Sequence, residues 1–141
     1  MRNLPRQLSA EELADLFEGR TRFVERLAEL EDPLGRAREI AATLSDEEKR
    51  EVLDAHPAIG ARKLSARSAA EQGTDEAPEL KELNSAYEEK FGFRFVVFVN
   101  RRSKSELVPV LRERLARSRE EELATALDQL VAIAEDRWRN S

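Results

Sequence analysis

The sequence predicts an all-α fold: a single compact multi-helix domain with one buried extended segment near residues 93–99. Apolar residues recur at helical spacing along most of the 141 residues. Ser-x-x-Glu capping boxes precede several of these stretches, and only one stretch is rich in β-branched and aromatic residues. Because the length suits one hydrophobic core, residues 1–141 are expected to form one domain.

Four helices are expected in the first part of the chain. Ser9 and Glu12 form a capping box that starts the first helix, and Ser45 and Glu48 form another that starts the fourth. The third helix follows Asp32-Pro33, where the aspartate is expected to cap and the proline to occupy the first turn. The apolar residues that mark the second helix are Phe23, Val24, Leu27 and Leu30.

The fourth helix is expected to stop near His56, because Pro57 disfavours the helical conformation at the residue before it. Residues 58–77 show no regular apolar pattern, and a stretch of this length inside a compact domain is more often functional or disordered than idle. Helical periodicity resumes over residues 78–91. Gly92 is then a typical helix stop.

Residues 93–99 are the only strongly β-prone stretch. No second comparable run offers a partner strand, so a buried extended segment between helices is expected instead. Two helices are expected to finish the chain, at roughly 104–117 and 119–138. Ser118 and Glu121 form the capping box of the last one.

The composition excludes several classes of function. With 24 Lys and Arg against 29 Asp and Glu, the net charge is -5, which gives no electrostatic footprint for nucleic acid and no polybasic membrane anchor. No cysteine and a single histidine exclude thiol chemistry, disulfides and Cys- or His-based zinc sites, although carboxylate-bound Mg²⁺ stays open. The N-terminus has no apolar signal region, so a cytoplasmic location is expected.

His56 is the first candidate for chemistry. It is the only side chain whose unperturbed pKa lies near neutrality, and its place directly before Pro57 favours a fixed position. The alternative, which the residues alone favour, is a surface histidine that interacts with the dipole at a helix C-terminus. His56 is therefore a hypothesis for proton transfer that needs a second observation.

Three further elements have a functional and a structural interpretation. The sequence Ser68-Ala-Ala-Glu71-Gln72 can aim polar side chains into a pocket or begin a capped helix, and the two are compatible. Residues 95–99 need backbone partners, which a planar polar ligand or neighbouring loops can supply. Arg137 can bind a substrate carboxylate or remain a solvated arginine near the end of the last helix.

Three motifs appear in order: His56-Pro-Ala-Ile-Gly-Ala-Arg62, Ser68-x-x-Glu71-Gln72 and Leu83-Asn-Ser-Ala-Tyr87-x-x-x-Phe91-Gly-Phe-x-Phe95. In residues, order and spacing the chain resembles the family of 2-oxo-4-hydroxy-4-carboxy-5-ureidoimidazoline (OHCU) decarboxylases. Each motif alone is weak, but the ordered set is specific. The resemblance runs from about residue 44 to residue 137, and the N-terminal helices fit the all-α fold of that family.

The resemblance implies a cofactor-independent carboxy-lyase of urate (purine) degradation that converts a small ureide, OHCU, to (S)-allantoin. It implies no cofactor, no metal, a homodimer, and no nucleic-acid or membrane partner. His56 resembles the catalytic acid/base, and Glu71 resembles its partner carboxylate. The positions that resemble substrate contacts are Pro57, Ser68, Gln72, Phe95, Val96, Val97, Phe98, Val99 and Arg137.

Two departures from the family pattern keep alternatives open. Arg94 stands where the family often has proline, and the stretch between the second and third motifs is short and lacks an expected Gly-Leu pair. A decarboxylase or lyase for a related ureide is therefore one alternative. A non-catalytic helical interaction module is another, but such a module has no reason to place His56, Glu71 and Arg137 around one cavity.

Overall fold

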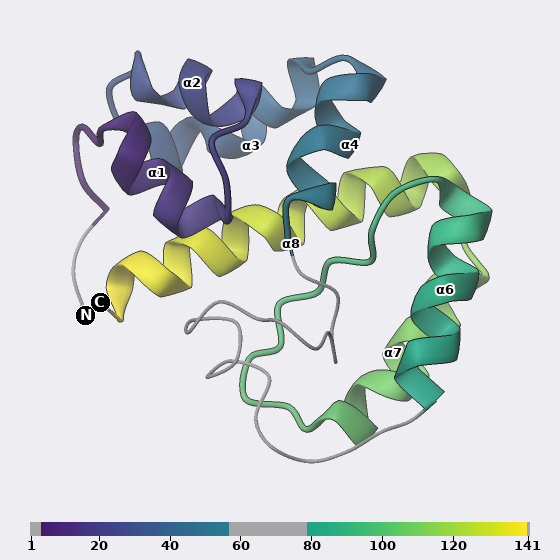
Figure 1. Cartoon of the computed structure of the whole chain (residues 1–141). Coiled ribbons are helices and arrows are strands. Elements are labelled where there is room, and N and C mark those ends of the chain that lie inside the picture. Colours follow the sequence, from purple (N-terminus) through teal and green to yellow (C-terminus); the bar gives the residue numbers. More distant parts are fainter. Residues whose placement is uncertain (1–3, 57–78, 141) are drawn as a thin grey trace.

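The computed structural model describes residues 4–56 and 79–140. This part of the chain forms seven α-helices and contains no strand, which confirms the predicted all-α fold. The longest helix, α8, crosses the molecule, with α1 to α4 along one side and α6 and α7 beside its first turns (Figure 1). The helices are α1 (Ala10–Phe17), α2 (Arg22–Ala28), α3 (Pro33–Thr43), α4 (Asp46–Asp54), α6 (Glu79–Phe91), α7 (Lys104–Leu115) and α8 (Arg119–Arg139).

Capping boxes start four of these helices. In each, the serine hydroxyl accepts a hydrogen bond from the amide of the glutamate three residues later, and that glutamate accepts one from the serine amide. The box of Ser103 and Glu106, which starts α7, was not predicted, although its Ser-x-x-Glu pattern is visible in the sequence. The three predicted boxes are confirmed: Ser9–Glu12, Ser45–Glu48 and Ser118–Glu121.

The predicted cap of α3 is wrong. Asp32 occupies the N-cap position, but its side chain makes no capping hydrogen bond and its backbone is left-handed, with φ of 53°. The carboxylate instead lies over Gly35, where Oδ2 of Asp32 would be 2.2 Å from a Cβ on that glycine. The Asp32 amide donates to the Arg6 carbonyl at 2.7 Å. Pro33 takes the first helical position, as expected.

Helix boundaries follow the sequence signals closely. The second helix is shorter than expected, because α2 ends at Ala28 and leaves Leu30 partly buried beyond it. The α4 helix ends just before His56, and α6 stops at Gly92, whose φ of 81° suits a residue without a Cβ. Within the described residues, no helix is both long and apolar enough to cross a membrane.

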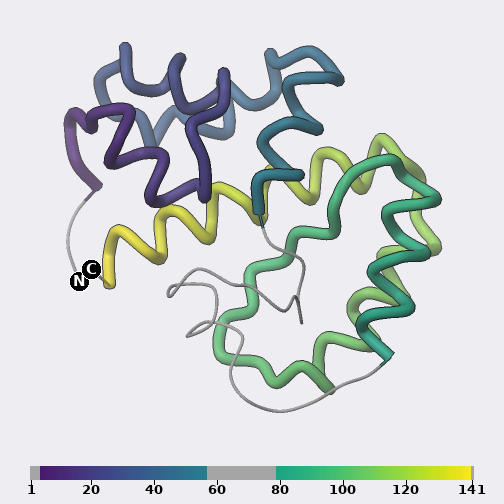
Figure 2. The backbone as a smooth tube through the Cα atoms, viewed as in Figure 1, coloured from purple at the N-terminus to yellow at the C-terminus, as the bar shows by residue number. Residues whose placement is uncertain are grey.

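The extended segment is buried as predicted. Phe95, Val96, Val97 and Val99 are each at most 7% exposed, whereas Phe98 is half-buried. The Phe95 ring packs edge-on against Tyr87 of α6, with centroids 5.2 Å apart. In Figure 2 this green segment leaves α6, passes the end of α4 and turns into α7. The extended segment therefore lies next to His56, the residue predicted to transfer protons.

Candidate active site

His56 lies one residue beyond the C-cap of α4 and is buried, with 5% of its surface exposed. Its amide donates to the Leu53 carbonyl at 3.2 Å, which continues the helical turn. Its Nε2 atom is buried and has no hydrogen-bond partner in the part of the chain that the structure describes. A buried polar atom without a partner calls for an explanation, and a catalytic role is one of those available. The surface-histidine alternative is wrong for this position.

The turn between α1 and α2 packs closely against the end of α4. A Cβ added to Gly19 would lie 3.4 Å from the Cβ of Ala55, so the two backbones approach closely there. The preceding residue, Glu18, has a left-handed backbone with φ of 64° and ψ of 22°. This conformation is uncommon for a residue with a side chain.

Arg137, in the last turns of α8, is also buried, with its side chain 3% exposed. Its Nη1 atom donates to the Leu16 carbonyl at 3.0 Å, and its Nη2 atom lies 3.0 Å from Oε1 of Glu18. The solvated-arginine alternative is therefore wrong. The end of α1 fixes the guanidinium by a hydrogen bond to a backbone carbonyl and an ion pair with a carboxylate.

The charges around His56 act together with its burial. Four effects together lower the pKa of His56 from its ordinary value of 6.5 to about 4, and burial is the largest of them. The positive charge of Arg137 lowers it further, the carboxylate of Glu18 opposes that effect, and Arg94 adds a smaller lowering. At neutral pH the imidazole is consequently neutral and able to accept a proton.

The backbone of the extended segment finds several partners inside the protein. Arg114 donates to the Val96 carbonyl at 2.8 Å, and the amide of Phe98 donates to Oε1 of Gln129 at 2.8 Å. Arg102 donates to the carbonyls of Phe98 and Val99, at 2.7 and 3.0 Å. For these groups the core alternative holds, since side chains rather than a ligand satisfy them.

The structure brings part of the predicted site together. His56 and Arg137 lie within electrostatic range of one another, and the extended segment reaches the same place through Arg94. Pro57, Ser68, Glu71 and Gln72 lie outside the described residues, so their placement beside His56 stays a prediction. Glu18 was missed, because a glutamate at the end of the first helix gives no local signal of a partner at the opposite end of the chain.

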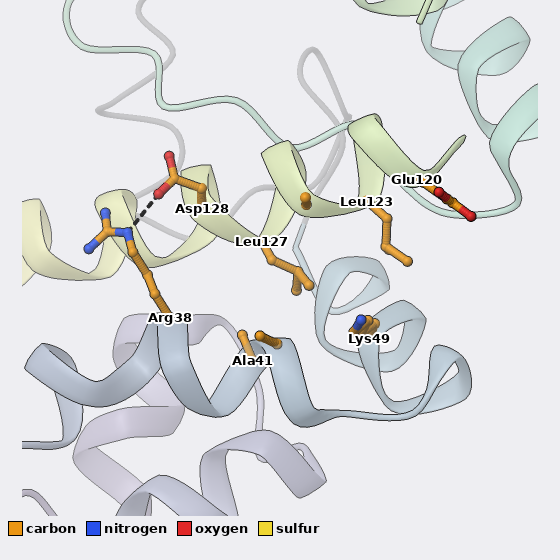
Figure 3. Close-up of a pocket in the computed structure, with 9 residues that line it drawn as sticks. Arg38, Ala41, Lys49, Glu120, Leu123, Leu127 and Asp128 are labelled. Atoms are coloured by element: carbon orange, nitrogen blue, oxygen red, sulfur yellow. Dashed lines mark hydrogen bonds and ion pairs between the residues drawn. The ribbon is translucent and has the colours of Figure 1, made fainter. Parts of the chain in front are cut away.

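A separate groove of about 300 Å³ lies between α3, α4 and α8 (Figure 3). An ion pair of Arg38 and Asp128, 2.6 Å apart, borders one end, and Lys49 and Glu120 lie at the other. None of the predicted site residues that the structure describes lines it. Among the described residues, no cluster of three carboxylate or imidazole side chains is placed to hold a metal ion. The apolar wall of the groove is formed by Ala41, Ala42, Leu123, Ala124 and Leu127.

Sequence comparison places the chain among proteins of one family. The family model of OHCU decarboxylase matches residues 2–139. The 2-oxo-4-hydroxy-4-carboxy-5-ureidoimidazoline decarboxylase of Haloferax volcanii is 35% identical over 116 residues, which are 76% of this chain and 67% of that protein. The uric acid degradation bifunctional protein of Bacillus sp. (strain TB-90) is 34% identical over 105 residues, which are 68% of this chain but 21% of the larger protein.

Solved structures agree with this assignment. A crystal structure of OHCU decarboxylase in the presence of (S)-allantoin matches with a TM-score of 0.69 and 26% identity, over 82% of this chain and 86% of that one. A crystal structure of (S)-allantoin synthase matches with a TM-score of 0.66 and 25% identity, over 91% of this chain and 47% of that one. The chain thus spans about half of the synthase and about a fifth of the Bacillus protein.

Proposed function

Because this chain belongs to the OHCU decarboxylase family, we propose that it catalyses the cofactor-independent decarboxylation of OHCU to (S)-allantoin. The observation that carries the proposal is the buried His56, whose pKa is about 4, within electrostatic range of the buried Arg137. A proton acceptor and a carboxylate-binding cation in one buried cluster suit a decarboxylase. They serve no purpose in a helical interaction module.

The substrate supplies its own electron sink. In OHCU the carbon that loses CO₂ adjoins an imine, so the electron pair of the breaking C–C bond forms a new C=C bond and displaces the imine π electrons onto nitrogen, which takes up a proton. The enol left behind loses its hydroxyl proton and gains a proton at the neighbouring ring carbon, which gives allantoin. The protein is required only to bind, orient and exchange protons, and no Schiff-base lysine or cofactor is needed.

Each site residue has a proposed part in this reaction. The neutral imidazole of His56 exchanges the proton of the substrate hydroxyl, and Arg137 binds the carboxylate or another polar substrate group. Glu71 orients His56 or the ureido group. The proposed substrate contacts are completed by Pro57, Ser68, Gln72, Phe95, Val96, Val97, Phe98 and Val99, apart from the Val96, Phe98 and Val99 carbonyls and the Phe98 amide, which protein side chains already satisfy.

The test is an assay on freshly generated OHCU with a stereochemical readout. Free OHCU loses CO₂ unaided, and its planar intermediate takes a proton from either face to give racemic allantoin. A preference of about 1.4 kcal/mol between the faces gives roughly a tenfold excess of one enantiomer. The protein is expected to yield predominantly (S)-allantoin faster than buffer. Racemic product at the uncatalysed rate would exclude this function. Turnover of a related ureide but not of OHCU would instead indicate a decarboxylase or lyase for that ureide.

We propose further that the enzyme is a cytoplasmic homodimer that acts on a small ureide and on neither nucleic acid nor membranes. The net charge of -5 supports the absence of a nucleic-acid partner. Light scattering of the purified protein is expected to give twice the 16.1 kDa chain mass. A monomeric mass would reject the dimer without bearing on the reaction.

A further inference from the structure

Arg94 lies in the extended segment beside the C-terminal end of α4, with its side chain 31% exposed. Its backbone amide donates to Oδ1 of Asp54 at 3.0 Å. Its Nη1 atom donates to two backbone carbonyls, that of Asp54 at 3.1 Å and that of His56 at 2.5 Å. One residue of the segment therefore makes three hydrogen bonds with the last residues of one helix.

These carbonyls lie at the end of a helix, where the last backbone oxygens accept no hydrogen bond from within the helix. A guanidinium at this place satisfies two of them and lies at the negative end of the helix dipole. On α6, Glu88 accepts from Nε of Arg94 at 3.1 Å, so the planar group is oriented from a second direction. A lysine keeps the charge but lacks the rigid fork that spans separate acceptors.

We propose that Arg94 is a positioning residue for His56: it fixes the His56 backbone at the end of α4 and so directs the imidazole into the site. The inference rests on the proposed role of His56 in proton exchange. Arg94 acts through the carbonyl of His56 and not on the substrate. Through Arg94, the extended segment and α6 also fix the position of the end of α4 relative to Arg137.

Within the described residues, three charged side chains face His56: Glu18 from the end of α1, Arg137 from α8 and Arg94 from the extended segment. After burial, Arg137 has the largest effect on the pKa of His56, and Arg94 lowers it in the same direction. Removal of the Arg94 charge is therefore expected to raise the pKa of His56. Because Arg94→Lys keeps this charge, changed imidazole signals and a lower kcat in that variant at an unchanged pKa of His56 report positioning rather than charge.

The experiment uses the fact that the chain contains one histidine, so imidazole NMR signals need no assignment. Arg94→Gln, Arg94→Lys and wild type are titrated without ligand and then assayed on OHCU. Arg94→Gln is expected to raise the pKa of His56 by about half a pH unit and to lower kcat about tenfold with KM little changed. Arg94→Lys is expected to keep the pKa near that of wild type but to lose part of kcat.

The matched control is Arg50→Gln, which removes an arginine of α4 that pairs with Asp46 one turn earlier. It is expected to leave the His56 signals and kcat unchanged. An Arg94→Gln protein with wild-type imidazole signals, pKa and kcat would overturn the proposal. If the wild type does not turn over OHCU, the proposed function fails, yet the imidazole chemical shifts of Arg94→Lys against wild type still test whether Arg94 positions His56.

Discussion

Among the described residues, two arginine–glutamate pairs are largely buried, and their surroundings differ. Arg114 of α7 and Glu122 of α8 lie 2.7 Å apart with side chains 7% and 0% exposed. Arg137 of α8 and Glu18 lie 3.0 Å apart with side chains 3% and 13% exposed. Burial and geometry are similar, so the difference lies in what surrounds each pair.

Core groups surround the Arg114–Glu122 pair, although Nη2 of Arg114 is buried without a hydrogen-bond partner among the described residues. Oε1 of Glu122 also accepts from the Tyr87 hydroxyl at 2.7 Å, and its Oε2 accepts from Arg117 at 3.1 Å. The Arg114 guanidinium lies over the Phe95 ring, 4.6 Å from its centroid. Burial and the bond to Glu122 raise the pKa of the Tyr87 hydroxyl, which therefore stays protonated. This pair holds α6, α7, α8 and the extended segment together.

The Arg137–Glu18 pair is adjacent to a group that titrates. Both members act on the pKa of His56, and the Nε2 atom of that histidine has no partner in the described part of the chain. A buried ion pair adds little net stability when its desolvation is counted. The comparison teaches that an arginine–glutamate pair surrounded by core groups ties helices together, whereas one beside a buried imidazole also acts on the pKa of that imidazole.

The sharpest test of the functional side is His56→Asn, which keeps a polar side chain of similar reach but cannot titrate. General acid–base groups contribute about 10²–10⁴-fold in rate, so kcat on OHCU is expected to fall by at least the lower value. The circular-dichroism melt at pH 7 is expected to stay close to that of wild type. Near-normal turnover by this variant would return His56 to a structural role.

Glu122→Gln tests the structural role of the Arg114–Glu122 pair. Removing one partner of a buried pair leaves Arg114 without its counter-charge, at an expected cost of about 3–5 kcal/mol in the free energy of unfolding. Urea denaturation measures this directly. Glu120→Gln, an exposed position two residues earlier on α8, serves as the control and is expected to change stability by less than about 0.5 kcal/mol. Equal effects at the two positions would contradict the assigned role of the Arg114–Glu122 pair.

The titration of His56 predicts a pH dependence of stability. The unfolded chain binds a proton below its ordinary pKa of 6.5, whereas the native imidazole stays neutral down to about 4. Stability is therefore expected to fall as the pH drops from 6.5 to 4, by on the order of 3 kcal/mol for this group, and to level off below. The contribution is isolated as the difference between wild type and His56→Asn across that range. A constant difference would show that the pKa of His56 is not lowered.

The sequence predicted the helices, their capping boxes and the buried segment better than the contacts of the candidate site. Capping boxes were readable because donor and acceptor lie three residues apart, and apolar periodicity located the helices. The buried segment followed from one β-prone run without a partner strand. The pairing of Glu18 with Arg137 was not predictable, because it depends on how α1 packs against α8. The cap at Asp32 failed because its left-handed backbone turns the carboxylate onto Gly35.

The smallest expected effect belongs to Glu18→Gln, and it decides whether the second pair is functional. The amide still accepts a hydrogen bond from Arg137, so the loss of stability is expected to be about 2 kcal/mol, less than at Glu122. Loss of the carboxylate removes the one charge among the described residues that raises the pKa of His56, so this pKa is expected to fall below 4. Arg94→Gln is expected to move it in the opposite direction, which makes the two variants controls for each other.

KM of the Glu18→Gln variant for OHCU is expected to rise about tenfold, because a loosely held Arg137 binds a carboxylate less well. Glu11→Gln, on the exposed face of the same helix, is expected to change neither KM nor the His56 titration. If Glu18→Gln behaved like Glu11→Gln, the Arg137–Glu18 pair would be as purely structural as the Arg114–Glu122 pair.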